Sequence, residues 1–311
     1  MKVGVIGVGA MGQHHARVYH EMDDVELIGV SDVDRLRAEE IAAMHGVQAF
    51  TDYKKLLSCD LDAVSVAVPT TLHKTVAMDV INDGVHLLVE KPIASTVEDA
   101  DEMLSAAKDA GVRLMVGHIE RYNPAVAKLK EIIDSGLLGD IVSMSARRVG
   151  PHNPRIRDVG IIMDLGVHDI DTISYLYNAK AKSVYAIAGN GLLDSHENHA
   201  GILMQFGTGR AGMIDVNWLT PHKVRRLTAV GTEGVAYLDY ISQTVELHDG
   251  DWIRSAKIEE KEPLANELEY FIGTVGGQRS RIFEDDGRYV LKTALAAIRS
   301  YREGQLVGVE G

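Results

Sequence analysis

The chain has 311 residues, of which 46% are hydrophobic and 25% charged, which leaves room for about two domains of roughly 150 residues and excludes a disordered chain. Acidic residues outnumber basic ones by 45 to 32, and the net charge of −13 argues against nucleic acid as a partner, because phosphates require a basic surface. The single cysteine, Cys59, cannot form an intrachain disulfide or a cysteine zinc site, so we expect a cytoplasmic protein. No apolar run approaches the roughly 18 residues of a membrane helix, so we expect no membrane partner.

The first 120 or so residues alternate between short apolar runs and longer amphipathic segments. The apolar runs predict buried strands of a parallel sheet at 3–7, 25–31, 63–68, 86–90 and 113–117. The segments between them have helical spacing, at 11–22, 35–45, 72–82 and 95–110. Gly46, Gly84 and Gly111 mark three helix ends, and Ser95 with Glu98 predicts a capping box. Repeated strand–helix units predict an α/β fold with a doubly wound parallel sheet.

The second part of the chain has a different pattern, in which strands follow one another without crossover helices. After a helix that begins at Pro124 and ends near Ser135, a strand at 140–149 and a helix at 161–177 are expected. Further strands with glycine-rich turns are expected at 183–188, 200–206, 210–219, 225–230, 235–240 and 244–248, and closing helices at 266–274 and 288–301. We therefore predict two domains, a nucleotide-binding domain at 1–122 and an α+β domain with an open, mostly antiparallel sheet at 123–311.

A glycine-rich turn separates the first expected strand from the first helix. It reads Gly7-Val8-Gly9-Ala10-Met11-Gly12, the G-x-G-x-x-G spacing of dinucleotide-binding turns. The first glycine permits the tight turn, the second lets the backbone approach a pyrophosphate, and the third lets helix and strand pack closely. The alternative is a glycine turn with a purely structural role.

The predicted cofactor is NAD rather than NADP. An acidic residue about 20 positions after the turn is expected to hold the adenosine ribose, and Asp32 stands there. Its carboxylate accepts a hydrogen bond from the ribose 2′-hydroxyl and repels a 2′-phosphate, although Arg35 and Arg37 are close enough to soften this preference. The predicted contacts are Gly7, Gly9, Ala10, Met11, Gly12 and Asp32.

Two further groups of polar residues point to catalysis. Glu90-Lys91-Pro92 ends an expected strand, at the edge where open α/β sheets bind ligands, although a solvated lysine in a turn is the alternative. Asp164 and His168 stand four apart on an expected helix, with Asp171 one turn further along the same face, although a surface ion pair is the alternative.

Oxidation of a secondary alcohol would use these residue types. A neutral His168 can accept the hydroxyl proton near pH 7 while a hydride leaves the carbon for a nicotinamide. The Lys91 ammonium would stabilise the developing alkoxide, and Asp164 would orient the pair or balance its charge. Metal ligation by Asp164, His168 and Asp171, or by residues 196–199, is an alternative, but hydride transfer needs no metal and none is expected.

Several motifs in this order resemble the glucose-fructose oxidoreductase / inositol dehydrogenase (Gfo/Idh/MocA) family. They are the glycine turn, Pro69-Thr70-Thr71-Leu72-His73, Glu90-Lys91-Pro92 and Asp164-x-x-x-His168-x-x-Asp171. The resemblance implies a Rossmann domain followed by an α+β domain whose open sheet often pairs subunits. It implies that Lys91 and His168 are the catalytic pair with Asp164 beside them, although some relatives carry Tyr at the His168 position. The further cofactor contacts that it implies are Val68, Pro69, Thr70, His73, Glu90 and Lys91.

An arginine-rich segment points to an anionic substrate. Residues 141–157 include Arg147, Arg148, Arg155 and Arg157 but no acidic residue. Arginine forks suit phosphate oxygens, although the adjacent Arg147 and Arg148 would face opposite sides of a strand. The stretches 117–124 and 155–160 resemble the nucleotide-sugar branch of the family, whose members oxidise C3 of UDP-N-acetylglucosamine, or of its uronic acid, to a 3-keto sugar that an aminotransferase uses. This resemblance implies substrate contacts at Arg121, Asn123, Arg155, Arg157, Asp164 and His168.

Other functions stay open. An inositol or free-aldose dehydrogenase would need no diphosphate clamp, and a reductase of imines or of a small ketone would use the same fold. A non-catalytic dinucleotide sensor is the alternative of another class.

The expected strands between 183 and 248 carry apolar residues at alternate positions. If the helix at 161–177 covers one face of their sheet, the other face needs a partner. We therefore expect a homodimer or homotetramer.

Overall fold

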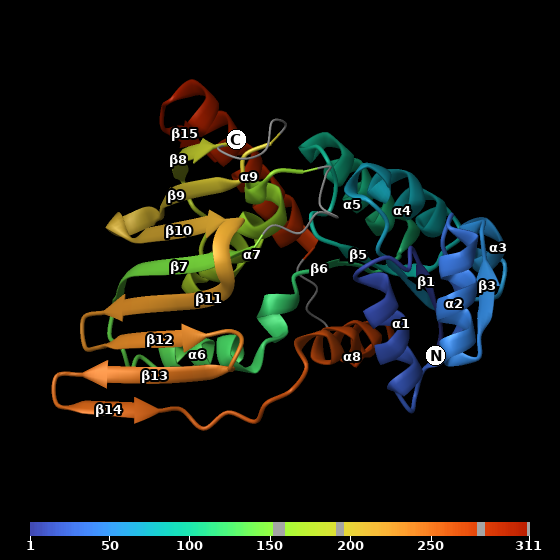
Figure 1. Cartoon of the computed structure of the whole chain (residues 1–311), viewed down its shortest axis with the longest axis horizontal. Coiled ribbons are helices and arrows are strands. Elements are labelled where there is room, and N and C mark those ends of the chain that lie inside the picture. Colours follow the sequence, from blue (N-terminus) through green and yellow to red (C-terminus); the bar gives the residue numbers. More distant parts are fainter. Residues whose placement is uncertain (152–158, 191–195, 279–283, 310–311) are drawn as a thin grey trace. The chain divides into compact units, whose positions relative to one another are not determined.

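The computed structural model describes residues 1–151, 159–190, 196–278 and 284–309, and the chain forms two units (Figure 1). One unit comprises Met1–Ile119 with Glu262–Arg288, and the other comprises Glu120–Lys261 with Tyr289–Gly311. The sequence had placed 262–288 in the second domain. This segment groups with the first unit because its helix α8 (Pro263–Val275) packs on α1 (Gly12–Glu21), and the Glu262 carboxylate accepts a 2.5 Å hydrogen bond from Arg17.

The first unit is built on a six-stranded parallel sheet with the order β3-β2-β1-β4-β5-β6. Its strands are β1 (Lys2–Ile6), β2 (Glu26–Ser31), β3 (Gln48–Phe50), β4 (Ala63–Val66), β5 (His86–Glu90) and β6 (Leu114–Gly117). Its helices include α1, α2 (Arg35–His45), α3 (Tyr53–Leu57), the 3-10 turn η1 (Thr70–Leu72), α4 (His73–Asn82), α5 (Val97–Ala110) and α8. The strand order reverses between β1 and β4, which confirms the expected doubly wound sheet. Sheets of this kind bind ligands at the carboxyl ends of the strands on either side of such a reversal.

Local signals in the first unit agree with the structure except at a few positions. Gly46 and Gly111 end α2 and α5 in the left-handed conformation, each with a φ of +67°. The predicted capping box at Ser95 is wrong by one residue, because the Thr96 hydroxyl accepts the hydrogen bond from the Asp99 backbone N–H at 3.1 Å. The elements β3 and α3, of three and five residues, were not predicted, because neither is long enough to show a hydrophobic period.

The second unit is built on a nine-stranded sheet with the order β14-β13-β12-β11-β7-β10-β9-β8-β15. Its strands are β7 (Ile141–Pro151), β8 (Ser183–Gly189), β9 (His199–Gln205), β10 (Ala211–Asn217), β11 (Leu219–Gly231), β12 (Val235–Asp239), β13 (Thr244–Asp249), β14 (Trp252–Ser255) and β15 (Val307–Gly308). Among these strands, β7 and β10 are parallel and the other neighbours are antiparallel, which confirms the expected open, mostly antiparallel sheet. The short strands β14 and β15 were not predicted.

Helices cover one face of this second sheet. They include α6 (Pro124–Asp134), the π-helical turn η3 (Ile162–Gly166) that leads into α7 (Val167–Tyr177), and α9 (Glu284–Glu303), with the 3-10 turns η2 (Ile119–Tyr122) and η4 (Gly207–Gly209) at loops. Burial alternates along β9, where Ile202 and Met204 are buried and Leu203 is exposed. The helix α7 packs on β7 and β10, so the buried side chains of the sheet face the helices and the other face is open. No helix in the described part of the chain has the length and apolar content needed to cross a membrane.

Candidate active site

The glycine turn after β1 leaves open space where a dinucleotide would approach. Gly7 has a φ of +85°, and a Cβ there would lie 2.7 Å from the Ala67 carbonyl oxygen. A Cβ on Gly12 would lie 1.8 Å from the Gly7 carbonyl oxygen, so α1 could not begin so close to the turn with any other residue. A Cβ on Gly9 would meet no atom within 4 Å. The first and third glycines therefore shape the turn, and the second faces open space, as expected where a dinucleotide backbone approaches.

Asp32 stands at the end of β2, beside this turn. Its carboxylate accepts hydrogen bonds from the backbone N–H groups of Val8 at 3.0 Å and Asp34 at 2.9 Å. These bonds fix a negative charge at the rim of the glycine turn, which fits the ribose of NAD. Arg35 pairs with Glu39 at 2.7 Å, and Arg37 lies 3.8 Å from Asp34, so both arginines have carboxylate partners on or next to α2.

The Lys91 loop after β5 is held by buried polar groups. The Lys91 backbone N–H donates to Glu90 Oε2 at 3.2 Å, and Glu90 Oε1 lies 3.0 Å from His15 Nε2. The other His15 nitrogen lies 2.9 Å from the Ser65 hydroxyl, which also contacts the Tyr19 hydroxyl. Burial alone would raise the pKa of the Glu90 carboxyl, but the hydrogen bond with His15 holds this pKa below its usual value. The network joins α1, β4 and β5, and it ends at the backbone of the predicted catalytic lysine.

His73 anchors the same loop from the other side. Its Nδ1 lies 2.9 Å from the Pro92 carbonyl oxygen, and its Nε2 lies 2.9 Å from the Val68 carbonyl oxygen. Burial lowers the pKa of the His73 imidazole. His73 and Glu90 are both buried, so their side chains act on the loop, whereas Pro69 is exposed and Thr70 half-buried at the rim. Their predicted cofactor contacts stay predictions.

The sequence did not single out His15. It stands three residues after the last glycine of the fingerprint, on the buried side of α1, and it has zero exposed surface. The sequence pattern that could have revealed His15 is a polar residue on the apolar face of a short helix. Its partners Ser65 and Glu90 lie 50 and 75 positions away, so no local pattern could identify them.

In the second unit, Asp164 lies in the π-helical turn η3 and His168 in the first turn of α7, and both are half-buried. Glu197 fixes the start of this segment, since its carbonyl oxygen accepts from Ile161 N–H at 3.0 Å and its carboxylate accepts from Ile162 N–H at 3.3 Å. The residues that the structure describes include no group of three or more metal-ligating side chains.

A buried ionic network holds α7 on the sheet. Arg148 donates to Asp169 at 2.9 Å and to Glu120 at 2.7 Å, and Arg121 pairs with Asp171 at 2.5 Å. Burial alone would lower the pKa of the Arg148 guanidinium, but the carboxylates of Asp169 and Glu120 hold it well above its usual value. Asp171 was expected beside Asp164 and His168, and its contact with Arg121 gives it a structural partner.

The predicted substrate residues fall into two groups. Arg121 and Asn123 are buried, and the Asn123 side chain caps α6 by accepting from Ala125 N–H at 3.0 Å while its amide donates to the Tyr240 carbonyl oxygen at 3.1 Å. Arg155 and Arg157 lie outside the described residues. Lys91 belongs to the first unit, and Asp164 and His168 belong to the second, so their joint action on one substrate stays a prediction.

Comparison with known proteins identifies the family. Residues 1–118 match the oxidoreductase family with an NAD-binding Rossmann fold, and residues 126–237 match the GFO/IDH/MocA C-terminal domain. The chain belongs to the Gfo/Idh/MocA oxidoreductase family. Its first unit is an NAD-binding Rossmann domain, and the chain is an NAD-dependent oxidoreductase that acts on CH–OH groups.

Several relatives are similar over nearly their whole length. The chain is 31% identical over 307 residues to the UDP-N-acetylglucosamine 3-dehydrogenase of Acidithiobacillus ferrooxidans, which covers 95% of each chain. A solved structure of that enzyme has a TM-score of 0.90 at 30% identity and covers 97% of this chain and 98% of the other. The myo-inositol 2-dehydrogenase of Thermotoga maritima is 28% identical over 331 residues, covering 100% of this chain and 99% of the relative.

Proposed function

We propose that this NAD-dependent sugar dehydrogenase oxidises C3 of UDP-N-acetylglucosamine to a 3-keto sugar. The observation that carries the proposal is the 31% identity to a UDP-N-acetylglucosamine 3-dehydrogenase over 95% of both chains. An inositol dehydrogenase is the second candidate, because a myo-inositol 2-dehydrogenase is 28% identical over the full chain. A free aldose would use the same chemistry as inositol.

The catalytic roles proposed here rest on what each side chain can do. When bound, NAD supplies the hydride acceptor for the oxidation. The His168 imidazole takes the hydroxyl proton, the Lys91 ammonium stabilises the alkoxide, and Asp164 balances or orients the pair. The backbone bond from Lys91 to Glu90 and the contact of His73 with the Pro92 carbonyl support the lysine role, because they fix the loop from which the ammonium extends.

The proposed cofactor preference is for NAD over NADP. It is supported by the Asp32 carboxylate at the glycine turn and by the carboxylate partners of Arg35 and Arg37. Measuring kcat/KM with each cofactor tests it. A higher kcat/KM with NADP would contradict the role of Asp32.

Incubating the protein with NAD and UDP-N-acetylglucosamine tests the substrate. We expect NADH to form, and hydroxylamine to trap a 3-keto product that mass spectrometry identifies. The Lys91→Ala variant is the control, and it should form NADH more slowly by about 10²-fold or more. Turnover of myo-inositol or glucose without turnover of the nucleotide sugar would overturn the substrate proposal and favour the second candidate.

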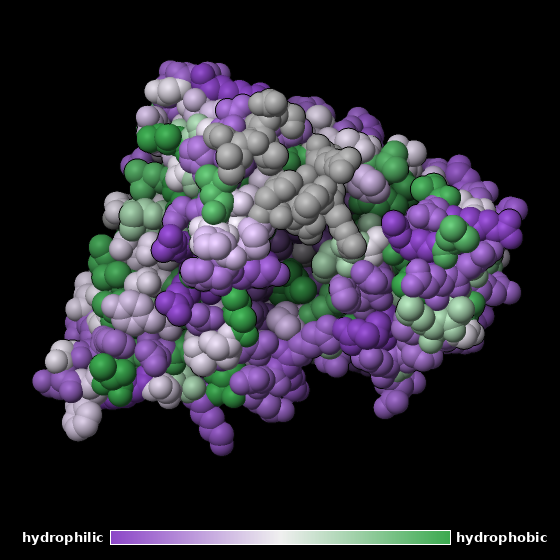
Figure 2. Space-filling view, viewed as in Figure 1, coloured by the Kyte–Doolittle hydropathy of each residue, from purple (hydrophilic) through white to green (hydrophobic). Residues whose placement is uncertain are grey.

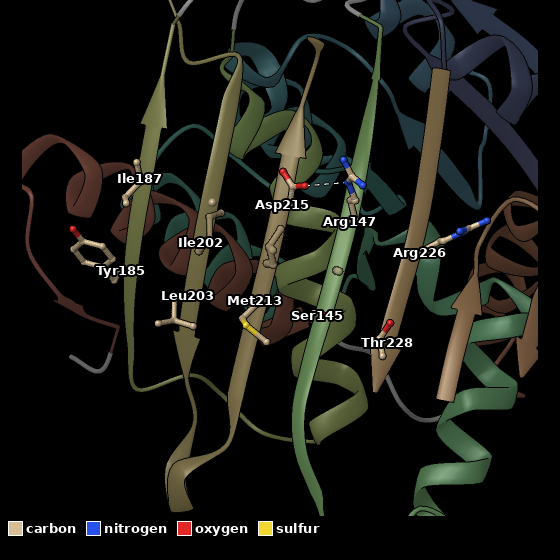
Figure 3. Close-up of a pocket in the computed structure, with 13 residues that line it drawn as sticks. Ser145, Arg147, Tyr185, Ile187, Ile202, Leu203, Met213, Asp215, Arg226 and Thr228 are labelled. Carbon is tan, nitrogen blue, oxygen red and sulfur yellow. Dashed lines mark ion pairs between the residues drawn. The ribbon is translucent and has the colours of Figure 1, made fainter. Parts of the chain in front are cut away.

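We also propose that copies of the chain associate through the open face of the second sheet. This face carries the exposed apolar side chains Tyr185, Ile187, Leu203 and Met213 on the neighbouring strands β8, β9 and β10 (Figure 3). In the space-filling view, apolar groups lie among hydrophilic ones over the strands of this unit (Figure 2). An apolar face of this kind is typical of a contact between subunits.

A further inference from the structure

Two pairs of arginines face each other across β7 and β11. In the antiparallel register, Arg148 stands opposite Arg225, and Arg147 stands opposite Arg226. Residues directly opposite each other lie on the same face of a sheet, and successive residues on a strand lie on opposite faces. Arg147 and Arg226 therefore share the open face, where both appear in Figure 3, and Arg148 and Arg225 share the face that the helices cover.

The two arginines on the open face have partners and stay exposed. Arg147 pairs with Asp215 at 3.1 Å, and Arg226 pairs with Asp239 at 2.9 Å. Their side chains are 59% and 70% exposed, so water screens the repulsion between them. No ligand is needed to explain these two charges.

On the face that the helices cover, only one of the two arginines forms ion pairs with carboxylates in the described part of the chain. Arg148 is 2% exposed and binds both Asp169 and Glu120. Arg225 is only partly exposed, and among the residues that the structure describes no carboxylate lies within 4.0 Å of its guanidinium and no hydrogen bond from it is formed. Directly opposed like charges destabilise a sheet, and of this pair only Arg148 has carboxylates in direct contact among the described residues.

The surroundings of Arg225 combine desolvation with nearby charge of both signs. Burial and the Arg148 guanidinium lower the pKa of Arg225, and the more distant carboxylates of Glu120, Asp169 and Asp164 oppose this shift. Arginine stays protonated in proteins, so the Arg225 guanidinium is a partly desolvated cation with its fork of donors available. Arg148, which stands opposite Arg225, binds Asp169 of α7, so Arg225 lies on the sheet face toward the helix that carries His168.

We propose that Arg225 binds an anionic oxygen of the sugar substrate, either a phosphate of a nucleotide diphosphate or a carboxylate of an acidic sugar. The inference rests on the proposed function, in which Asp164 and His168 contact the substrate. A guanidinium fork matches both anions, and each charge-assisted hydrogen bond is stronger where water is partly excluded. Arg225 is thereby a residue that selects acidic sugar substrates over neutral ones.

Binding measurements with Arg225→Gln and the matched control Arg226→Gln test the proposal. The two residues are adjacent on β11 and face opposite sides, so they separate the effect of the covered face from a general loss of charge. Calorimetric titration in the presence of NAD would use UDP-N-acetylglucosamine, glucuronate and myo-inositol as the diphosphate, carboxylate and neutral probes. We expect Arg225→Gln to weaken binding of one or both anionic probes by roughly 10-fold or more, with no effect on myo-inositol, and Arg226→Gln to match wild type.

The outcomes separate this proposal from the proposed function. NADH formation by the wild type decides the substrate that is oxidised, whereas the ratio of Kd values between the two variants decides the role of Arg225. An equal Kd for both anionic probes in Arg225→Gln and wild type, or an equal loss in Arg226→Gln, would overturn the proposal. If Arg225→Gln fails to fold by circular dichroism, Arg225→Lys keeps the charge and removes the fork. That variant should lose affinity for the anionic probe, and wild-type affinity would count against the proposal.

Discussion

Alanine substitutions at Gly9 and Gly12 should separate cofactor binding from folding within one turn. A Cβ on Gly12 would lie 1.8 Å from the Gly7 carbonyl oxygen, far inside the 3.0 Å below which Cβ contacts essentially never occur. Gly12→Ala must therefore move α1 away from the turn, and overpacking of this kind costs about 1–3 kcal/mol or more of stability. Gly9→Ala meets no atom within 4 Å, so its free energy of unfolding should stay within about 1 kcal/mol of the wild type.

The effect of Gly9→Ala should appear in binding, because its new methyl group fills the space that a pyrophosphate needs. Hydrogen bonds to charged groups contribute about 1.5–3 kcal/mol, so losing one from the turn should weaken NAD binding by roughly 10- to 150-fold. Thermal unfolding without cofactor measures the first effect, and calorimetric titration with NAD measures the second. Wild-type NAD affinity in Gly9→Ala would refute the assignment of the pyrophosphate to this turn. Unchanged stability in Gly12→Ala would refute the close approach of α1.

Three further predictions concern catalysis, pH and assembly. Lys91→Ala and His168→Ala should bind NAD normally by calorimetry but lose about 10²–10⁴-fold in turnover, because we propose that both side chains act on the substrate oxygen. Wild-type rates would remove that residue from the mechanism. Burial lowers the pKa of His73 in the folded chain, so the unfolded chain binds a proton more readily near pH 6. The stability of the wild type relative to His73→Gln should therefore fall as the pH drops below about 6.5, which urea titrations at several pH values would measure. A rise in this relative stability would instead show that the two carbonyl contacts of His73 favour the imidazolium. Leu203→Asp on the open sheet face should convert the oligomer to a monomer, which light scattering would measure. The control Leu137→Asp, at another exposed leucine, should leave the oligomer intact. A monomeric wild type would contradict the proposed interface.

Much of the backbone of both units could be predicted from local sequence, because most elements have either an apolar run or an apolar period between turn residues. Strands such as β4 and β6 are buried on both faces and read as continuous apolar runs, whereas β9 alternates between buried and exposed residues and reads as half-buried. The π-helical start of α7 could not be predicted. Its first residues bond to Glu197, which contacts Ile162 from 35 positions away in the sequence.

The side-chain partners of the candidate site were largely beyond local patterns. The sequence predicts roles for Asp32 and Lys91 from their positions after strands, but it does not show their partners. Asp32 accepts from Val8 N–H, and the Lys91 backbone donates to Glu90, which contacts His15. Asn123 was expected to bind substrate, and the structure uses its side chain to cap α6. Local sequence does not show which partners a polar residue next to a helix start takes, and the predicted substrate contact of Asn123 stays a prediction.

The number of arginines in a segment does not show which of them can bind an anion, because the sheet determines the partners of each one. The positive charge of the segment with Arg147 and Arg148 predicts an anion site, yet both residues pair with carboxylates of the chain. The sequence gives no such prediction for Arg225, because it lies 77 positions after Arg148, next to one other arginine in an ordinary strand sequence. It becomes distinctive only when β11 pairs with β7 and sets it opposite an arginine that has taken the nearby carboxylates. Recognition of an anion at this sheet would therefore depend on long-range register, which fixes the face and the neighbours of each arginine.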